Sequence, residues 1–255
     1  MSDAPVLKER RERILVITIN RPEQRNAVNA AVAHGIADAL DELDADPGLA
    51  LGVLTGAGKG FSAGMDLKAF AAGDVPHVDG RGFAGITQRA SRKPLIAAIE
   101  GFAVAGGLEV ALACDLIVAA RGARLGIPEV KRSLVAAGGG LLRLPKMLPR
   151  NVAVELALTG EPIDTERAHA LGLVNRLAEP GGALETALEL AQEIAANGPL
   201  ALQATKRILL ESADWPESEF FARQADISGP VFASEDAQEG ARAFAEKRDP
   251  VWKGK

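Results

Sequence analysis

Short runs of consecutive apolar residues constrain the fold of this chain most. Four of these runs suit strands, at residues 14–19, 51–55, 95–99 and 116–120. A strand that is apolar at every position is buried on both faces, as in a parallel sheet covered by helices. Helical patterns over residues 28–43 and 106–114 fall between these runs. This alternation predicts an α/β fold with right-handed crossovers.

The last third of the chain has a different pattern. From residue 151 onward Ala, Leu and Glu dominate and strand-like runs disappear, so helices are expected there. Helical periodicity predicts helices over 183–196, 200–210 and 235–247, with a helix stop and start at 197–199. We expect a change of layer near residue 150. The Gly-rich stretch 71–85 lacks periodicity and is expected to be a mobile loop beside a site.

Composition excludes several classes of protein. The 255 residues suffice for a full core, and 29 basic against 34 acidic residues give a net charge of −5. We therefore expect neither nucleic acid nor an anionic membrane as a partner. The single cysteine, Cys114, cannot form an intramolecular disulfide, which fits a reducing compartment. Residues 1–13 are charged and resemble no signal peptide, so the protein is expected to be cytoplasmic.

The glycine-rich segment after the second predicted strand matches neither of two nucleotide-binding motifs. The segment 56–60, GAGKG, follows a predicted strand. It lacks the Ser or Thr after the lysine and the glycine spacing of a P-loop. Phe61 stands where the dinucleotide fingerprint needs its third glycine. Neither motif supports a nucleotide site.

Residues 60–64 match the G-x-S-x-G pattern of a hydrolase, with Ser62 as the nucleophile. Asp164 and His169 follow in the order of a catalytic triad. That motif needs its serine at a sharp strand-to-helix turn, whereas a glycine-rich segment separates Ser62 from the preceding strand. His169 lies among alanines on a predicted helix, where a packed structural histidine is the simpler interpretation. A Ser62-dependent hydrolase is therefore kept as the rival hypothesis.

Two blocks carry a family resemblance. Residues 61–67, FSAGMDL, and 99–109, IEGFAVAGGLE, resemble the two oxyanion-hole signatures of the crotonase (enoyl-CoA hydratase/isomerase) superfamily. Further matching segments span nearly the whole chain. The resemblance implies an α/β, crotonase-like (ββα)-repeat spiral core with a CoA-thioester site over residues 1–195. It also implies a helical C-terminal trimerisation region over 196–255, and a homotrimer or a hexamer built as a dimer of trimers.

The resemblance assigns an oxyanion hole. Thioester chemistry at Cα passes through an enolate-like state, whose oxygen needs preorganised donors. By resemblance these donors are the N–H groups of Ala63 and Gly106. The thioester is then expected to lie along Ala63, Gly64, Met65 and Asp66. The small residues would let the backbone approach the substrate closely.

Other implied contacts have structural alternatives. Asp66 could instead cap a helix that starts near Leu67. The resemblance places Phe244 and Lys247 on the last helix near the CoA nucleotide, often across a subunit boundary. The alternative is a solvated lysine and a core phenylalanine on an amphipathic helix.

Two glutamates are the candidate acid and base. Glu109 lies three residues after Gly106, and Glu129 comes 20 residues later, directly after Pro128. Both positions match the glutamate pair of enoyl-CoA hydratases. By resemblance Glu109 is mainly the base that activates water, and Glu129 the acid toward Cα. The alternative for Glu129 is an ion pair, for which the sequence offers Arg124, Lys131 and Arg132.

The resemblance implies an enoyl-CoA hydratase, a hydro-lyase that adds water syn to a short or medium trans-2-enoyl-CoA and yields 3-hydroxyacyl-CoA. No cofactor and no metal are expected, because CoA is part of the substrate. Carnitinyl-CoA dehydratase is the alternative, since 82–85 and 243–254 resemble that relative. The lack of Tyr and 4% aromatic content mildly favour an uncharged acyl chain.

Four further alternatives are less favoured. Isomerases and thioester hydrolases of this fold commonly lack one of the two glutamates, as do its decarboxylases. A non-catalytic, RNA-associated member fits poorly with the net acidic charge. Residues 133–138 replace the Gly-Pro turn common in hydratases, which leaves the acyl group open.

Overall fold

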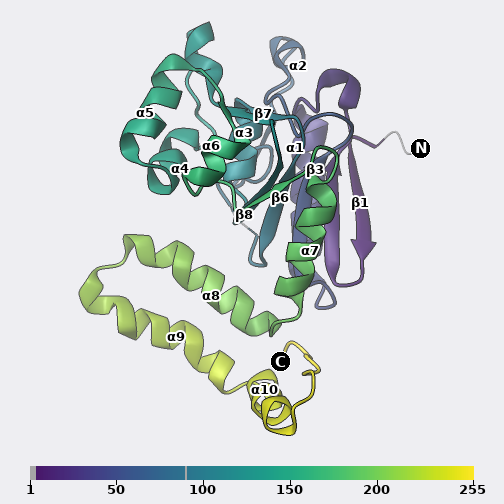
Figure 1. Ribbon diagram of the computed structural model, residues 1–255, viewed down its shortest axis with the longest axis vertical. Coiled ribbons are helices and arrows are strands. Elements are labelled where there is room, and N and C mark those ends of the chain that lie inside the picture. Colours follow the sequence, from purple (N-terminus) through teal and green to yellow (C-terminus); the bar gives the residue numbers. More distant parts are fainter. Residues whose placement is uncertain (1–3, 90) are drawn as a thin grey trace.

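The computed structural model describes residues 4–89 and 91–255 (Figure 1). Its main sheet has the order β1-β2-β3-β6-β8-β11, in which β1 is antiparallel to β2 and the other neighbours are parallel. The strands are β1 (Val6–Arg11), β2 (Ile14–Ile19), β3 (Leu51–Gly56), β6 (Leu95–Ile99), β8 (Leu116–Ala120) and β11 (Arg176–Ala178). The four strands expected from apolar runs are confirmed, and so is the α/β fold.

A second sheet has three strands. It consists of β10 (Ile163–Asp164), β9 (Arg124–Gly126) and β7 (Phe102–Val104), while β4 (His77–Val78) and β5 (Gly82–Phe83) form a separate hairpin. The expectation that strands disappear after residue 151 is wrong, because β10 and β11 lie there. Both are so short that their pairing with β9 and β8, rather than an apolar run, defines them.

Helices bury both faces of the main sheet. Leu15 and Ile17 of β2 face the cluster that holds α1 (Ala30–Ala45), whereas Ile14 and Val16 face the cluster that holds α7 (Ala183–Ala195). This alternation is the period-two geometry of a strand between two layers. The helices between α1 and α7 are α2 (Leu67–Ala71), α3 (Gly106–Leu112), α4 (Gly140–Met147), α5 (Arg150–Thr159) and α6 (Thr165–Ala170). A 3-10 turn, η1 (Pro22–Gln24), precedes α1, and another, η2 (Pro128–Arg132), lies between α3 and α4.

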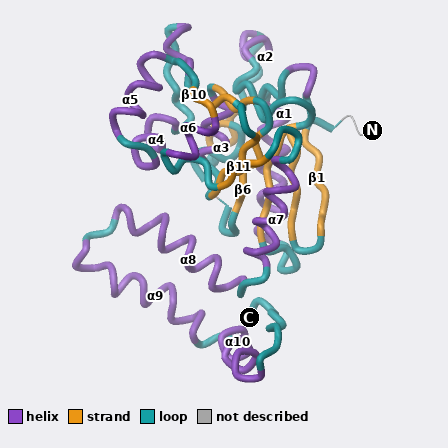
Figure 2. Tube along the Cα trace, in the orientation of Figure 1, coloured by secondary structure: helices purple, strands orange, loops and turns teal. Residues whose placement is uncertain are grey.

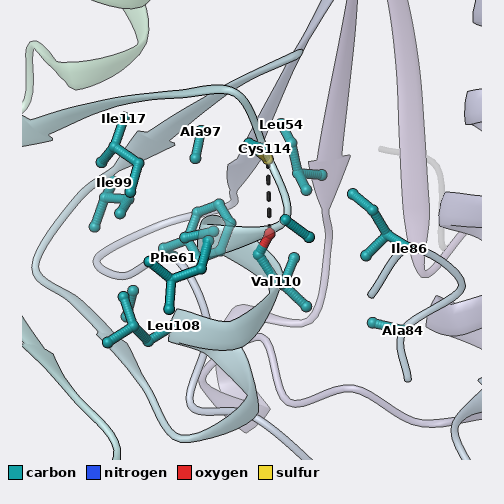
Figure 3. Close-up of a cluster of buried hydrophobic side chains, with 14 of the residues drawn as sticks. Leu54, Phe61, Ala84, Ile86, Ala97, Ile99, Leu108, Val110, Cys114 and Ile117 are labelled. Atoms are coloured by element: carbon teal, nitrogen blue, oxygen red, sulfur yellow. Dashed lines mark hydrogen bonds between the residues drawn. The ribbon is translucent and has the colours of Figure 1, made fainter. Parts of the chain in front are cut away.

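The core beneath α3 is apolar. Figure 3 shows Phe61, Leu108 and Val110 in this cluster together with Cys114, whose thiol donates to the Val110 carbonyl at 3.6 Å. Cys114 is buried and free, and burial raises the pKa of its thiol. The cysteine therefore acts as a small core residue.

The segment 71–85 differs from the expected mobile loop in its second half. There β4 and β5 form a hairpin, in which Phe83 and Ala84 are buried. The Phe83 ring packs against Gly106, where an added Cβ would lie 2.6 Å from the ring. The hairpin therefore packs against the first residue of α3.

Helices α8 (Pro199–Glu211), α9 (Phe220–Phe232) and α10 (Glu235–Glu246) form an arm that extends from the core (Figures 1 and 2). The expected helices over 183–196, 200–210 and 235–247 are confirmed as α7, α8 and α10, and α9 was not foreseen. Every residue of α9 is at least partly exposed, and Phe221 and Phe232 are 78% and 79% exposed. The division at residues 195/196 falls just after α7 and stays a prediction, as does the trimerisation role.

No helix in the described part of the chain is long and apolar enough to cross a membrane.

A buried ion pair fastens α8 to the core. The Lys206 ammonium donates to Asp115 Oδ2 at 2.6 Å and to the Lys93 carbonyl at 2.9 Å. Asp115 Oδ2 also accepts the Leu95 N–H at 2.8 Å, at the start of β6. Lys206 is only 8% exposed. The arm is thus fixed to the sheet by an ion pair. Removing one partner would leave the other charge buried and uncompensated, which destabilises the fold.

We expect Lys206→Met to lower the free energy of unfolding by about 3 kcal/mol, because it leaves the Asp115 carboxylate buried and uncompensated. Urea denaturation measures this loss. Arg207→Met, at the exposed neighbouring position, is the matched control and should change stability by less than about 0.5 kcal/mol. Equal losses in the two variants would contradict the anchoring role.

Candidate active site

Glycines allow the two sequence blocks to pack against each other. Ser62 and Ala103 form a parallel bridge, and an added Cβ on Gly107 would lie 2.2 Å from the Ser62 carbonyl oxygen. An added Cβ on Gly64, which has a φ of +87°, would lie 2.7 Å from the Gly106 nitrogen. The first turn of α3 therefore packs directly on the backbone of residues 62–64.

The hydrogen bonds around residues 62–66 show which backbone N–H groups already have an acceptor. The Ala63 N–H donates to the Arg25 carbonyl at 3.0 Å, and the Gly64 N–H donates to Ser62 Oγ at 3.1 Å. The expectation that Ala63 supplies an oxyanion donor is therefore wrong. Among the described residues, no acceptor faces the N–H groups of Met65 and Gly106.

The register of one β-bridge explains why the N–H group of Met65, rather than that of Ala63, is free. Met65 pairs in parallel with Val28, which donates to the Gly64 carbonyl and accepts the Asp66 N–H. In a parallel bridge the central residue directs its own N–H away from its partner. The Met65 amide is consequently left free, and no local sequence signal could have revealed this.

Ala105 holds a backbone conformation that favours glycine. As the residue before α3 it has φ +52° and ψ −134°, and its N–H donates to the Gly126 carbonyl at 2.9 Å. A non-glycine residue in this region is strained by about 1–3 kcal/mol. The strain lies directly before Gly106, so it is linked to the direction of the free amide.

Glu109 projects from α3 into a tight turn of three glycines. Its side chain is buried, and Oε1 accepts the Gly140 N–H at 2.9 Å. An added Cβ on Gly138 would lie 2.5 Å from Oε2. Burial raises the pKa of the Glu109 carboxyl, although the amides of Gly140 and Gly138 and the charge of Arg143 oppose this increase. The carboxyl is thus fixed in place and poised to exchange a proton.

Glu129 lies on η2 and meets no cation. Its Oε2 is buried and has no hydrogen-bond partner in the described residues. Burial and the neighbouring Glu109 charge raise the pKa of Glu129. The expected alternative of an ion pair fails, since Lys131 pairs with Glu161 and Arg124 donates to the Pro162 carbonyl. The charge of Glu109 thus acts on Glu129, which has no cation in an ion pair with it among the described residues.

The residues of the rival hydrolase do not form a triad. Ser62 is fully buried, and its Oγ donates to the Asn26 carbonyl at 2.8 Å. Nδ1 of His169 contacts the Val174 carbonyl at 2.8 Å, and Asp164 caps α6 by accepting the Arg167 N–H. Each group already has a structural partner, so the hypothesis of a Ser62 nucleophile is wrong.

The remaining candidates lie in different places. Asp66 caps α2 by accepting the Ala69 N–H at 3.1 Å and pairs with Arg21 at 2.9 Å, so its structural alternative is confirmed. Phe244 is 87% exposed on α10, so the expectation of a core phenylalanine is wrong, and Lys247 ends that helix with a φ of +55°. In Figure 1 α10 lies far from α2 and α3. A contact of Phe244 and Lys247 with the CoA nucleotide stays a prediction.

Within the described residues, no group of three or more His, Cys, Asp or Glu side chains is placed to hold a metal ion.

Comparison with known proteins agrees with this geometry. The family model described as enoyl-CoA hydratase/isomerase matches residues 9–255. The crystal structure of enoyl-CoA hydratase EchA1 from Mycobacterium marinum is 62% identical and has a TM-score of 0.98, covering 99% of this chain and 100% of that chain. Enoyl-CoA hydratase EchA19 of Mycobacterium tuberculosis is 43% identical over 98% of this chain and 96% of its own length. Carnitinyl-CoA dehydratase of Salmonella typhimurium is 43% identical over 95% of both chains.

The sheet order, the α3 packing and the paired carboxyls define a protein of the crotonase fold. The chain belongs to the enoyl-CoA hydratase/isomerase family.

We expect Ala105→Gly to raise the free energy of unfolding by about 1 kcal/mol, because glycine adopts the strained φ and ψ values without a Cβ penalty. Chemical denaturation measures the change. Ala72→Gly is the control, since Ala72 is exposed and has an ordinary φ of −88°. It should leave stability unchanged or lower it. A destabilised Ala105→Gly protein would show that residue 105 is not strained.

Proposed function

We propose that this protein is an enoyl-CoA hydratase, a hydro-lyase that adds water syn across the double bond of a short or medium trans-2-enoyl-CoA and forms 3-hydroxyacyl-CoA. The observation that carries the proposal is the buried Glu109 and the half-buried Glu129, whose Oε2 has no hydrogen-bond partner in the described residues, together with the free amides of Met65 and Gly106. Relatives named enoyl-CoA hydratase support it. We propose no cofactor and no metal for this reaction.

The free amides account for activation of the thioester. In the proposed complex its carbonyl oxygen accepts the N–H groups of Met65 and Gly106, which lower the energy of the enolate as negative charge develops. These donors belong to the backbone and keep their direction during the reaction. Polarisation of the thioester makes Cβ electrophilic and Cα able to accept a proton.

The two carboxyls then divide the proton transfers. Glu109, held by the Gly140 amide, takes a proton from water as the water oxygen bonds to Cβ. Glu129 gives its proton to Cα, so the elements of water are added and the pair exchanges one proton overall. The raised pKa of Glu129, caused by burial and by the nearby Glu109 charge, suits the role of acid.

The acyl group has a second candidate. A relative named carnitinyl-CoA dehydratase supports crotonobetainyl-CoA as the alternative substrate. We further propose that the chain forms a homotrimer or a dimer of trimers in the cytoplasm. Large apolar side chains on the arm, such as Phe221 and Phe232, support subunit contacts there.

Glu109→Gln is expected to reduce kcat for hydration of crotonyl-CoA by about 10²–10⁴-fold, because the amide cannot accept the water proton. The loss of enone-thioester absorbance follows the reaction, and calorimetry tests whether CoA-ester binding is kept. Glu161→Gln, on an exposed pair with Lys131, is the control and should retain full activity. An inactive wild type would reject the simple enoyl substrate, and crotonobetainyl-CoA would be tested next.

Gly64→Ala is expected to lower kcat/KM by about 100-fold, the typical effect of losing one oxyanion donor. Its Cβ would lie 2.7 Å from the Gly106 nitrogen and crowd the oxygen position. Gly73→Ala is a matched control, because Gly73 has nearly the same φ, +88° against +87°, with nothing within 4 Å of the added Cβ. Equal activity in the two variants would exclude a role for the space beside Gly64.

A further inference from the structure

Arg143 lies on α4, next to the glycine turn that contacts Glu109. Its Nη2 donates to the Thr87 carbonyl at 2.7 Å, which ties α4 to the chain segment after β5. An added Cβ on Gly139, which has a φ of +101°, would lie 2.1 Å from Nη1 of Arg143. The guanidinium is therefore folded back over Gly139.

The same turn contacts the carboxylate. Added Cβ atoms on Gly138 and Gly140 would lie 2.5 Å from Oε2 and 3.2 Å from Oε1 of Glu109. The three consecutive glycines are thus in contact with Glu109 at their two ends and with Arg143 at their centre. Only residues without side chains allow this approach.

The charge of Arg143 needs compensation. Its Nη1 is buried and has no hydrogen-bond partner within the described ranges. Of the described carboxylates, Glu109 is the one whose charge acts on Arg143. A half-buried guanidinium is costly unless a negative charge lies near it. Glu109 supplies that charge through the glycine turn, without direct contact.

We propose that Arg143 is a positioning residue for the base: its guanidinium, fixed by the Thr87 carbonyl, lies over the Gly138–Gly140 turn, keeps the Gly140 N–H on Oε1 of Glu109 and holds a positive charge next to the turn that contacts this carboxylate. The catalytic meaning of this inference rests on the proposed function. Arg143 itself touches no reacting atom.

The expected pH dependence follows from the charges around Glu109. Arg143 on α4 favours the ionised form, Glu129 on η2 disfavours it, and the Gly138 and Gly140 amides favour it. Removing the positive charge of Arg143 raises the pKa of Glu109, because one of the influences that favour the ionised carboxylate is lost. Because the base must be ionised, the acid limb of kcat/KM moves to higher pH by the same amount.

The experiment compares pH profiles of crotonyl-CoA hydration for wild type, Arg143→Gln, Arg143→Lys and Lys146→Gln. Lys146 is exposed on the same helix, so its variant removes an equal charge without changing the site. We expect the acid limb of Arg143→Gln to move to higher pH, and the limbs of Arg143→Lys and Lys146→Gln to stay close to wild type. A merely structural role for Arg143 would lower kcat at every pH and leave the limb in place.

A second measurement needs no turnover. Carbon-13 NMR of glutamate-labelled protein follows the Glu109 carboxyl, whose signal is assigned by its loss in Glu109→Gln. Its midpoint should rise in Arg143→Gln and return in Arg143→Lys. If Arg143→Gln does not fold, Arg143→Met, which keeps the apolar stem, replaces it in both measurements.

The two measurements separate the possible failures. An inactive wild type with a shifted Glu109 titration in Arg143→Gln would overturn the proposed substrate and support the role of Arg143. An unchanged Glu109 titration, or an equal shift in Arg143→Lys and Arg143→Gln, would overturn the role of Arg143 whether or not the enzyme hydrates crotonyl-CoA.

Discussion

The close packing of α3 on the segment 62–64 is the contact on which the rest of the site depends. Gly107 allows it, because any side chain there would collide with the Ser62 carbonyl, which is backbone and cannot move aside. This approach brings the free amides of Met65 and Gly106 to one place. It also sets the direction of α3, and with it the inward course of Glu109. The strained backbone of Ala105 is tolerated because the surrounding contacts fix it.

Electrostatics inside the site are asymmetric although the two acids are chemically alike. Glu109 has amide donors and a nearby guanidinium, whereas Glu129 has a buried, unpartnered oxygen and a negative neighbour. Amide donors and a guanidinium therefore favour the charge on Glu109, whereas burial and a negative neighbour disfavour the charge on Glu129. This difference suits the proposed roles of a base at Cβ and an acid at Cα.

Features that depend on one segment of the chain could be predicted from the sequence, whereas features that arise when distant segments pair could not. Fully apolar strands such as β2 and β3 were predictable, because burial on both faces leaves a continuous apolar run. β11 was missed, because three residues carry too little pattern and its pairing with β8 alone defines it. Glu109 and Glu129 were identified from a family pattern, and the structure places them as neighbours. The Ala63 amide was assigned wrongly, because the parallel bridge between Val28 and Met65 decides which N–H groups are used.

The sequence by itself determined the layered α/β architecture, since apolar patterning is a local property of the chain, and the family, since the two blocks that carry the resemblance are each continuous in sequence. The same resemblance named Glu109 and Glu129 as the candidate acids. Tertiary structure alone decided which amides are free, which carboxyl accepts an amide hydrogen bond, and how Arg143 comes to lie over the glycine turn. These depend on register and on close approach between segments distant in sequence. A hydrogen bond from Ala63 to Arg25, or a guanidinium over Gly139, exists only once those segments meet.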